Sequence, residues 1–318
     1  MRHFLDFEKP VAELETKIEE LRKMSEAGGL NIADEVSKLT EKADRQLRTT
    51  YAKLTAWQKT QVARHPQRPK ATDYIRALIA DWTPLAGDRA FAEDAAILSG
   101  IGRFRGRSVM VLATEKGWDT ESRVAHNFGM VRPEGYRKAR RLMKLAGRFG
   151  LPILTFVDTA GAFPGIDAEA RGQAEAIARS IEACVEASVP MVATIIGEGG
   201  SGGAIAIAAG DAVLMMEHSI YALISPEGCA AILWKDASNA TIAAEALKLT
   251  AEDLKRLKLI DCVVPEPLGG AHRDPQAAIA AVGDAVQAAL TPLLALDTAA
   301  LRARRREKYL EMGRETIT

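Results

Sequence analysis

The glycine-rich stretch Gly197–Ala204, with the sequence GEGGSGGA, is the part of the chain best suited to chemistry. It follows an apolar segment that predicts a strand, Met191–Ile196, and it opens a short helix of small and aliphatic residues, Ala204–Ala209. Glycines let backbone N–H groups crowd close to a ligand, because no side chain stands in the way. A helix start adds N–H groups without acceptors and the positive end of the helix dipole. This glycine run therefore predicts a binding site for an oxygen that carries or develops negative charge.

A second loop of small residues follows another predicted strand, Ile153–Val157. This small-residue loop, Asp158–Gly165, has the sequence DTAGAFPG, and a helix is predicted from about Asp167. In an open α/β sheet, ligands bind at the carboxyl ends of strands, where such turns gather. The two loops can therefore converge and offer N–H donors from separate segments to one oxygen. Two ordinary strand–helix turns, each needing glycine only for its own geometry, remain the alternative.

The glycine run also matches the dinucleotide-binding fingerprint. Gly197, Gly199 and Gly202 have the G-x-G-x-x-G spacing, and Glu217 lies where an acidic ribose ligand is expected. Against this, the helix that follows is very short and apolar on every side, whereas a Rossmann crossover helix is longer and amphipathic. The fingerprint also usually belongs to the first strand–helix unit of its domain. Binding of NAD or FAD is therefore a less favoured alternative.

A nucleophile elbow, G-x-S-x-G, is a third match, with Ser201 as the nucleophile. A hydrolase would also need an acid and then a histidine later in the chain. Only His218 and His272 follow, and neither stands in a context that indicates a triad base. Ser201 is more simply a small residue in a glycine turn. Cys229, near a predicted helix start, could be a nucleophile, but small apolar packing is favoured.

Side-chain catalysts are otherwise not evident. No Lys-Ser/Thr closes the glycine run as in a P-loop, and the three cysteines form no Cys-x-x-Cys pair. The isolated histidines His3, His65 and His126 show no metal-ligand spacing, so no metal is expected in this chain. An enzyme with this sequence must use oriented backbone donors and a base that the substrate or a cofactor supplies.

The elements that must position these loops alternate along the chain from about Ala95. Two helices of crossover length are predicted, the basic Gly135–Phe149 and the amphipathic Glu169–Ala187. Strands separated by such helices imply parallel crossover units and an α/β fold. The predicted strands are Val109–Thr114, Ile153–Val157, Met191–Ile196, Val213–Met216, Tyr221–Ile224 and Cys262–Val264.

Helical segments flank this core. Apolar residues at helical spacing predict an N-terminal amphipathic helix through Val11, Leu14, Ile18 and Leu21, and a further helical stripe over Tyr74–Trp82. An alanine-rich helical tail is predicted from Pro275 to Thr318. It ends in a basic run that is most often a solvated helix face.

Bulk composition excludes several classes of protein. Lys+Arg and Asp+Glu each number 42, so the net charge is zero and no polyanion partner is implied by the overall charge. Aromatic residues are 5%, which argues against a base-stacking nucleic-acid platform. The first residues lack the apolar core of a signal peptide, and no apolar stretch reaches the length of a membrane span. We therefore expect a cytoplasmic protein with no membrane partner.

These features resemble the carboxyltransferase alpha subunits of multi-subunit bacterial acetyl-coenzyme A carboxylase. Total length and the charged helical N-terminus also fit, so the resemblance covers essentially the whole chain. Its order and spacing of motifs are highly specific. The motifs are Arg137–Arg148 leading into Leu151–Ile153, Asp158–Gly165, Gly197–Ala204 and Ser225–Gly228.

The resemblance implies a crotonase-like fold, a superhelix of β-β-α units, with a helical N-terminal extension and C-terminal helices. It divides the chain into an N-terminal helical arm (1–34), a carboxyltransferase domain (35–294) and a C-terminal helix (295–318). Within the domain it implies a helical lead-in to about residue 90 and a crotonase-like core at about 91–270.

The implied reaction transfers a carboxyl group from carboxybiotin to acetyl-coenzyme A and gives malonyl-coenzyme A for fatty-acid synthesis. Biotin is held on a separate biotin carboxyl carrier protein and not on this chain; biotin carboxylase is a further partner. A beta subunit carrying a zinc-binding domain supplies the other half of the active site in an α2β2 assembly. The alternative is that this chain is not an enzyme subunit but a non-catalytic scaffold, whose helical termini hold partners together.

The resemblance also implies roles for individual residues. Carboxyl transfer generates negative oxygens on biotin and on the thioester, and both need N–H donors; a biotin nitrogen can act as the base. Gly202 and Gly203 are expected to stabilise the ureido oxygen, although which oxyanion each glycine pair holds stays open. The basic helix Gly135–Phe149 lies near coenzyme A phosphates or has a solvated or subunit-facing role. Further residues expected to bind biotin or substrate are Gly161, Ala162, Phe163, Gly165, Gly199 and Gly200.

Overall fold

The computed structural model describes residues 3–28 and 33–314. An eight-stranded sheet forms its centre, in the order β1-β2-β3-β4-β5-β6-β8, with β7 paired to the end of β5. The strands β1 to β3 are antiparallel, and the pairs from β3 onward are parallel. The strands are β1 Ile79–Pro84, β2 Ile97–Phe104, β3 Arg107–Thr114, β4 Ile153–Thr159, β5 Met191–Gly200, β6 Ala212–Met216, β7 Ile220–Ala222 and β8 Cys262–Val264.

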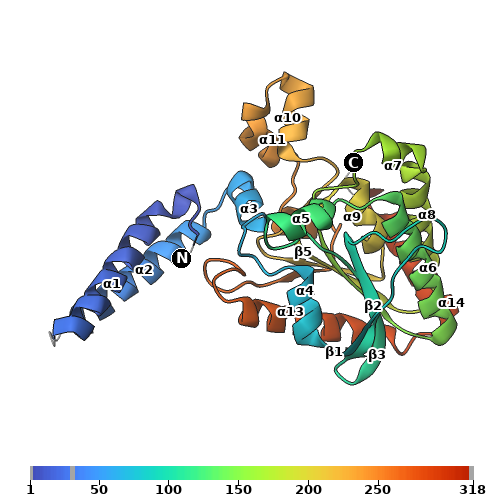
Figure 1. The fold of residues 1–318 in the computed structure, drawn as a ribbon, viewed down its shortest axis with the longest axis horizontal. Coiled ribbons are helices and arrows are strands. Elements are labelled where there is room, and N and C mark those ends of the chain that lie inside the picture. Colours follow the sequence, from blue (N-terminus) through green and yellow to red (C-terminus); the bar gives the residue numbers. More distant parts are fainter. Residues whose placement is uncertain (1–2, 29–32, 315–318) are drawn as a thin grey trace.

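Helices cover both faces of this sheet (Figure 1). The central strands are apolar runs, and all of β4 and nearly all of β5 is buried, as expected for parallel strands between two helical layers. One layer is α6 (Pro133–Phe149), α8 (Gln173–Glu186) and α9 (Ser201–Ala208). The opposite layer is α4 (Ala71–Leu78) and α13 (Pro275–Leu293). This arrangement places both strand–helix loops at one edge of the sheet.

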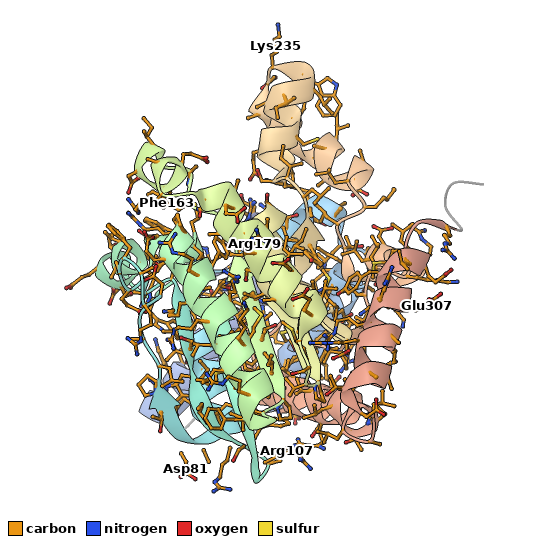
Figure 2. All side chains as sticks on the ribbon, turned by 90° about the vertical axis from the view of Figure 1, so that its right-hand side faces the viewer. Asp81, Arg107, Phe163, Arg179, Lys235 and Glu307 are labelled. Carbon is orange, nitrogen blue, oxygen red and sulfur yellow. The ribbon has the colours of Figure 1, made fainter. Side chains whose placement is uncertain are left out.

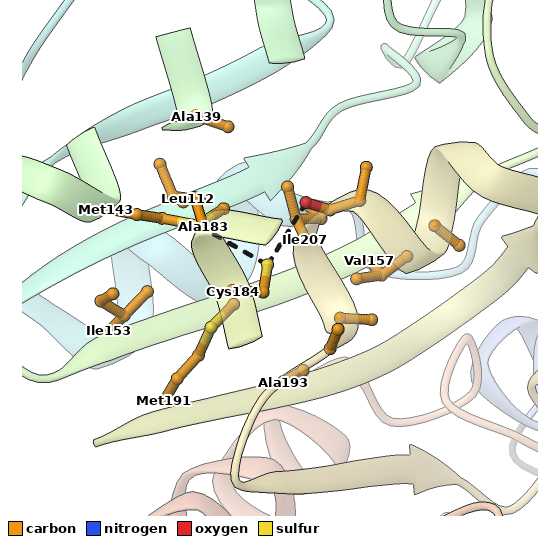
Figure 3. Close-up of a cluster of buried hydrophobic side chains, with 14 of the residues drawn as sticks. Leu112, Ala139, Met143, Ile153, Val157, Ala183, Cys184, Met191, Ala193 and Ile207 are labelled. Atoms are coloured by element: carbon orange, nitrogen blue, oxygen red, sulfur yellow. Dashed lines mark hydrogen bonds between the residues drawn. The ribbon is translucent and has the colours of Figure 1, made fainter. Parts of the chain in front are cut away.

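The core beneath the first layer is closely packed (Figure 3). Leu112 from β3, Met143 from α6, Cys184 from α8 and Ile207 from α9 are all buried there. The Cys184 thiol donates to the Ala206 carbonyl at 3.4 Å, and burial raises the pKa of this thiol to about 12. Cys184 is therefore a packing residue.

The N-terminal segment projects from the body as a helical pair (Figure 1). It contains η1 (Asp6–Glu8), α1 (Lys9–Gly28) and α2 (Ala33–Tyr51). The fully buried Glu8 accepts a hydrogen bond from the Tyr51 hydroxyl at 3.0 Å and contacts Arg273 at 3.4 Å. Arg273 also donates to Glu15 at 2.6 Å, so a buried charge network anchors the pair to the body.

The remaining helices lie at the sheet edges and in the connections. Among them α10 and α11 form a lobe that stands away from the body (Figure 1). The C-terminal α14 is fixed by Arg305, whose buried guanidinium pairs with Asp211 at 2.6 Å. These helices are α3 Ala56–Ala63, α5 Thr120–Ala125, η2 Asn127–Gly129, α7 Ile166–Ala170, α10 Pro226–Trp234, η3 Ala237–Asn239, α11 Ala240–Ala246, α12 Ala251–Arg256 and α14 Thr298–Glu311.

The structure corrects several predicted boundaries. The helix predicted over Tyr74–Trp82 is wrong in its second half, because α4 ends at Leu78. The following residues form the strand β1, which pairs with β2. The helix Glu169–Ala187 is broken at Gly172, which has a φ of +81°. The strand at Tyr221–Ile224 is shorter, since β7 ends at Ala222.

The predicted helical C-terminal tail consists of two helices, α13 and α14. The helix α13 ends at Leu293, and Asp297 caps α14 by accepting from the Ala300 N–H at 2.8 Å. Within the described residues, no single helix has the length and apolarity needed to cross a membrane. Only α13 and α14 together pass that test, and they are bent by 117°. The predicted arm and tail also include residues 1–2, 29–32 and 315–318, which lie outside the described residues.

Candidate functional site

The two loops meet at the carboxyl ends of β4 and β5. Thr159 lies opposite Gly199 in the parallel register. A Cβ atom on Gly200 would overlap the Ala160 carbonyl oxygen, and a Cβ atom on Gly203 would lie 2.7 Å from the Gly161 carbonyl carbon. Glycine is therefore required at both positions by close backbone approach, and the expected convergence of the loops is confirmed.

The glycine run divides between a strand and a helix. The strand β5 continues to Gly200, and α9 begins at Ser201 rather than at Ala204. Ser201 has a φ of +57°, a left-handed conformation that is uncommon for a residue other than glycine. Gly202 and Gly203 follow in the first turn of α9, where N–H groups have no intrahelical acceptor. The turn therefore presents backbone donors at the end of the sheet.

The two glycines differ in their surroundings. Gly202 is partly exposed, and a Cβ atom there would meet only the Ile177 Cγ2 atom, at 3.4 Å. Gly203 is buried against the small-residue loop and the Tyr136 hydroxyl. The open side of this turn is thus at Gly202, and the packed side is at Gly203.

The other predicted site residues lie in two groups. Gly161 and Ala162 face the glycine run, with Gly161 at a φ of +148° and Ala162 bridged to Val131. Phe163 lies under the Arg132 guanidinium at 4.2 Å, and Gly165 is the residue before α7. Gly199 is buried within β5 and paired with Tyr221 of β7, so it belongs to the support of the turn.

Tyr136 is a neighbour of the turn that the sequence reasoning missed. Its hydroxyl is fully buried, has no hydrogen-bond partner among the described residues, and would lie 2.9 Å from a Cβ atom on Gly203. Burial raises the pKa of this phenol, so it stays protonated. Tyr136 lies on α6, between Gly135 and Arg137 in a segment that indicates only a basic helix, so the sequence gave no local signal of a role.

Four charged side chains form a charge cluster under the glycine run: Arg64, Lys116, Asp158 and Glu198. The Lys116 ammonium lies 2.8 Å from Asp158 and 3.0 Å from Glu198, and Arg64 contacts Glu198 at 2.6 Å. Burial tends to raise the pKa of both carboxyls, but Lys116, together with Lys70 for Asp158 and Arg64 for Glu198, outweighs it and holds both pKa values below their usual range. Both acids are therefore ionised. The charges within the apolar strand ends were the only sequence signal for this cluster.

The rival patterns find little support in the structure. Glu217, the expected ribose ligand, accepts from the Glu266 N–H at 3.1 Å. His218 packs edge-on against Tyr51, and His272 stacks on His65 at 3.7 Å, so both rings make packing contacts. The described residues contain no group of three or more His, Cys, Asp or Glu that could hold a metal.

Comparison with known sequences gives full-length matches. Residues 4–313 match the family described as acetyl co-enzyme A carboxylase carboxyltransferase-like. The acetyl-coenzyme A carboxylase carboxyl transferase subunit alpha of Acidiphilium cryptum is 71% identical over 98% of both chains. The protein of the same name from Gluconacetobacter diazotrophicus is 66% identical over 100% of both chains.

Solved structures share the fold at low identity. The Pseudomonas malonate decarboxylase hetero-tetramer in complex with coenzyme A aligns with a TM-score of 0.57 at 17% identity, over 70% of this chain and 91% of that chain. Transcarboxylase 12S aligns with a TM-score of 0.57 at 18% identity, over 70% of this chain but only 41% of that chain. These likenesses confirm the crotonase-like α/β fold. With the full-length sequence matches, they show that this chain belongs to the alpha subunits of the acetyl-coenzyme A carboxylase carboxyltransferase family.

Proposed function

We propose that this chain supplies the biotin-facing half of a carboxyltransferase site, with the Gly202 and Gly203 N–H groups donating to the ureido oxygen of biotin. The observation that carries the proposal is the paired arrangement of the glycine run and the small-residue loop at the start of α9. Each preorganised donor contributes about 2.7–4 kcal/mol to such reactions. The reaction is transfer of a carboxyl group to acetyl-coenzyme A, giving malonyl-coenzyme A for fatty-acid synthesis in the cytoplasm.

The residues present fit a neutral, flat group that gains negative charge on one oxygen. Carboxybiotin, held on the biotin carboxyl carrier protein that biotin carboxylase loads, supplies the carboxyl group. The open side of Gly202 leaves room for a ligand beside the N–H donors, and Gly203 fixes their direction through its contact with Gly161. We place Ala162, whose nitrogen packs against Gly203, and Phe163 beside the bound biotin, with Gly165 as the residue before α7. Gly199 and Gly200 hold the turn from below.

A partner must complete this site. The reaction develops negative charge on two oxygens, one on biotin and one on the thioester, and this chain supplies donors for one of them. The alpha naming of the relatives and the multi-chain fold neighbours imply a beta partner. We propose an α2β2 assembly, with zinc in the beta subunit. We also propose that the arm (1–34) and the C-terminal helix (295–318) flank the carboxyltransferase domain (35–294), the second boundary lying between α13 and α14.

The α10–α11 lobe is the surface we assign to this beta partner. The lobe stands above the body at the same end as Phe163, with Lys235 at its tip (Figure 2). It carries a group of large apolar side chains that are each more than 40% exposed, and such patches mark interaction sites. They are Leu223, just before the lobe, and Ile232, Leu233, Trp234 and Ile242.

Replacing Leu233 by serine is expected to weaken binding of the beta subunit about tenfold to a hundredfold. A buried leucine side chain contributes about 1.5–3 kcal/mol, and each 1.4 kcal/mol is about tenfold in affinity. Sedimentation velocity on mixtures of the two subunits measures the change. The control is Leu310→Ser on α14, where a similarly exposed leucine lies outside the lobe. Equal affinity for Leu233→Ser and the unchanged chain would remove the lobe from the interface.

The proposed activity is tested by mixing the purified alpha and beta subunits and measuring malonyl-coenzyme A decarboxylation with free biotin. We expect activity only when both subunits and biotin are present. Full activity of the beta subunit alone would favour the scaffold alternative for this chain. Retention of NAD or FAD by the purified chain would favour the dinucleotide alternative.

A further inference from the structure

The Glu198 side chain connects separate parts of the chain under the glycine run. Its carboxylate accepts from Lys116 Nζ at 3.0 Å and from Arg64 at 2.9 and 2.6 Å. Lys116 follows β3, Arg64 ends α3, and Glu198 itself belongs to β5. Glu198 is only 5% exposed, so the two cations and not water hold its charge.

The backbone of β5 changes its partner strand next to Glu198. Residues Val192–Ile195 pair with β6, whereas Glu198–Gly200 pair with β7. Between these pairings, the Ile196 carbonyl accepts from Arg68 Nε at 2.7 Å. On the other side, the Glu198 N–H donates to Asp158 Oδ1 at 2.9 Å. Charged side chains thus stabilise the strand where its partner on one edge changes from β6 to β7.

Little freedom remains between Glu198 and the donor turn. Gly199 is held between Thr159 and Tyr221 by pairing on both edges. Gly200 packs against the Ala160 backbone, and Ser201 is confined to a left-handed conformation. We therefore expect a shift of Glu198 to be transmitted to Gly202 and Gly203, because the intervening Gly199 and Gly200 lie in close contact with neighbouring segments.

The same cluster reaches the α10–α11 lobe. Arg64 contacts Glu227 in the first turn of α10 at 2.6 Å while it holds Glu198. Planar guanidinium groups suit such double contacts with carboxylates, because they donate in a fixed fork geometry. The position of the donor turn is thus coupled to the base of the lobe that we assign to the beta partner.

We propose that Glu198 is a positioning residue of the carboxyltransferase site: held by Lys116 and Arg64, it fixes the end of β5 and so the direction of the Gly202 and Gly203 N–H groups. The proposal rests on the proposed function of these two glycines. Glu198 acts through the backbone and not by contact with the reacting oxygen.

Replacing Glu198 by glutamine is the direct test in the reconstituted alpha–beta enzyme. Lys116 keeps Asp158, and Arg64 keeps Glu227, so neither cation is left alone. We expect kcat to fall about tenfold to a hundredfold, since misplacing catalytic groups by about 1 Å has effects of this size. KM for malonyl-coenzyme A is expected to stay unchanged, because it does not depend on the donor direction. Affinity for beta is expected to stay unchanged, because Arg64 keeps its contact with Glu227 at the base of the lobe. Hydrogen exchange in the peptide over Gly197–Ala204 is expected to become faster.

Two further variants make the test decisive. Glu175→Gln breaks an exposed ion pair with Arg179 on α8 (Figure 2) and is expected to leave kcat unchanged. Arg64→Lys keeps the positive charge but loses the fork geometry, so it is also expected to lower kcat. If Glu198→Gln does not fold, the kcat of Arg64→Lys tests the positioning role in its place. Unchanged kcat in the folded Glu198→Gln variant, or a loss of kcat that only follows weaker binding of beta, would overturn the positioning role. If a Gly203 variant is inactive while Glu198→Gln is fully active, the positioning role of Glu198 is overturned, but the proposed donor function of the glycines is not.

Discussion

Replacing Gly203 by alanine is expected to lower kcat of the reconstituted enzyme about a hundredfold. The added Cβ atom would lie 2.7 Å from the Gly161 carbonyl carbon and 2.8 Å from the Ala162 nitrogen. Both are backbone atoms and cannot rotate away, so α9 and the small-residue loop must move apart. A displacement of about 1 Å is enough for a loss of this size. Decarboxylation of malonyl-coenzyme A with free biotin measures the change.

Gly202→Ala tests the open side of the same turn. A Cβ atom on Gly202 would meet only the flexible Ile177 side chain, at 3.4 Å, so the fold is expected to tolerate this variant. The added methyl group would instead enter the space where we place biotin, so a higher concentration of free biotin is expected to be needed for the same decarboxylation rate. Full activity of Gly203→Ala together with an unchanged biotin dependence of Gly202→Ala would contradict the oxyanion proposal.

The sequence alone was sufficient to predict that the two loops meet at one edge of the sheet. Strand–helix turns of parallel strands meet at one edge of a sheet, so the glycine run and the small-residue loop had to be neighbours once Ile153–Val157 and Met191–Ile196 were identified as strands. The rival patterns at the glycine run were also separable from the sequence, because the short apolar helix after it indicates a core helix.

The antiparallel edge of the sheet, formed by β1 and β2, could not be predicted, because the sequence of these two strands lacks a clear strand pattern. The strand β2 contains Gly100 and Gly102, which weaken a strand pattern. Their Cβ atoms would overlap Thr83 and Ile79 of β1, so both glycines are explained only by the packing of a strand that was itself expected to be helical. Apolar spacing near Trp82 favoured a helix, and pairing with β2 overrode that preference.

The side chains that support the site could not be predicted from the sequence, for a different reason. Arg64 and Glu198 are 134 residues apart in the chain, and Tyr136 reaches the turn from α6, another helix of the layer that contains α9. A charge within an apolar strand indicates that a partner exists, because a buried ion requires one. It does not identify the partner, which depends on tertiary packing.

Replacing Arg68 by methionine is expected to destabilise the chain by about 3–5 kcal/mol. Arg68 and Glu266 form an ion pair with no exposed side-chain surface, at 2.6 Å, and Arg68 also holds the Ile196 carbonyl and the Ser219 hydroxyl. Removing one partner of a buried pair leaves an uncompensated charge, and the loss is of this size. Urea unfolding at pH 7 measures it. The control is Arg103→Met, whose exposed pair with Asp81 contributes about 0–1 kcal/mol; a loss of that size for Arg68→Met would contradict the prediction.

The same pair predicts a specific dependence of stability on pH. Burial alone would raise the pKa of Glu266, but Arg68 and hydrogen bonds to the carboxylate lower this pKa to about 2, from a usual value near 4.5. A carboxyl whose pKa is depressed on folding stabilises the folded state above its unfolded pKa, and this contribution is lost as the pH falls toward the folded pKa. The difference in unfolding free energy between the unchanged chain and Glu266→Gln is therefore expected to be full at pH 7 and to shrink between about pH 5 and pH 2. A difference that stays constant over this range would show that Glu266 is not ionised in the folded chain.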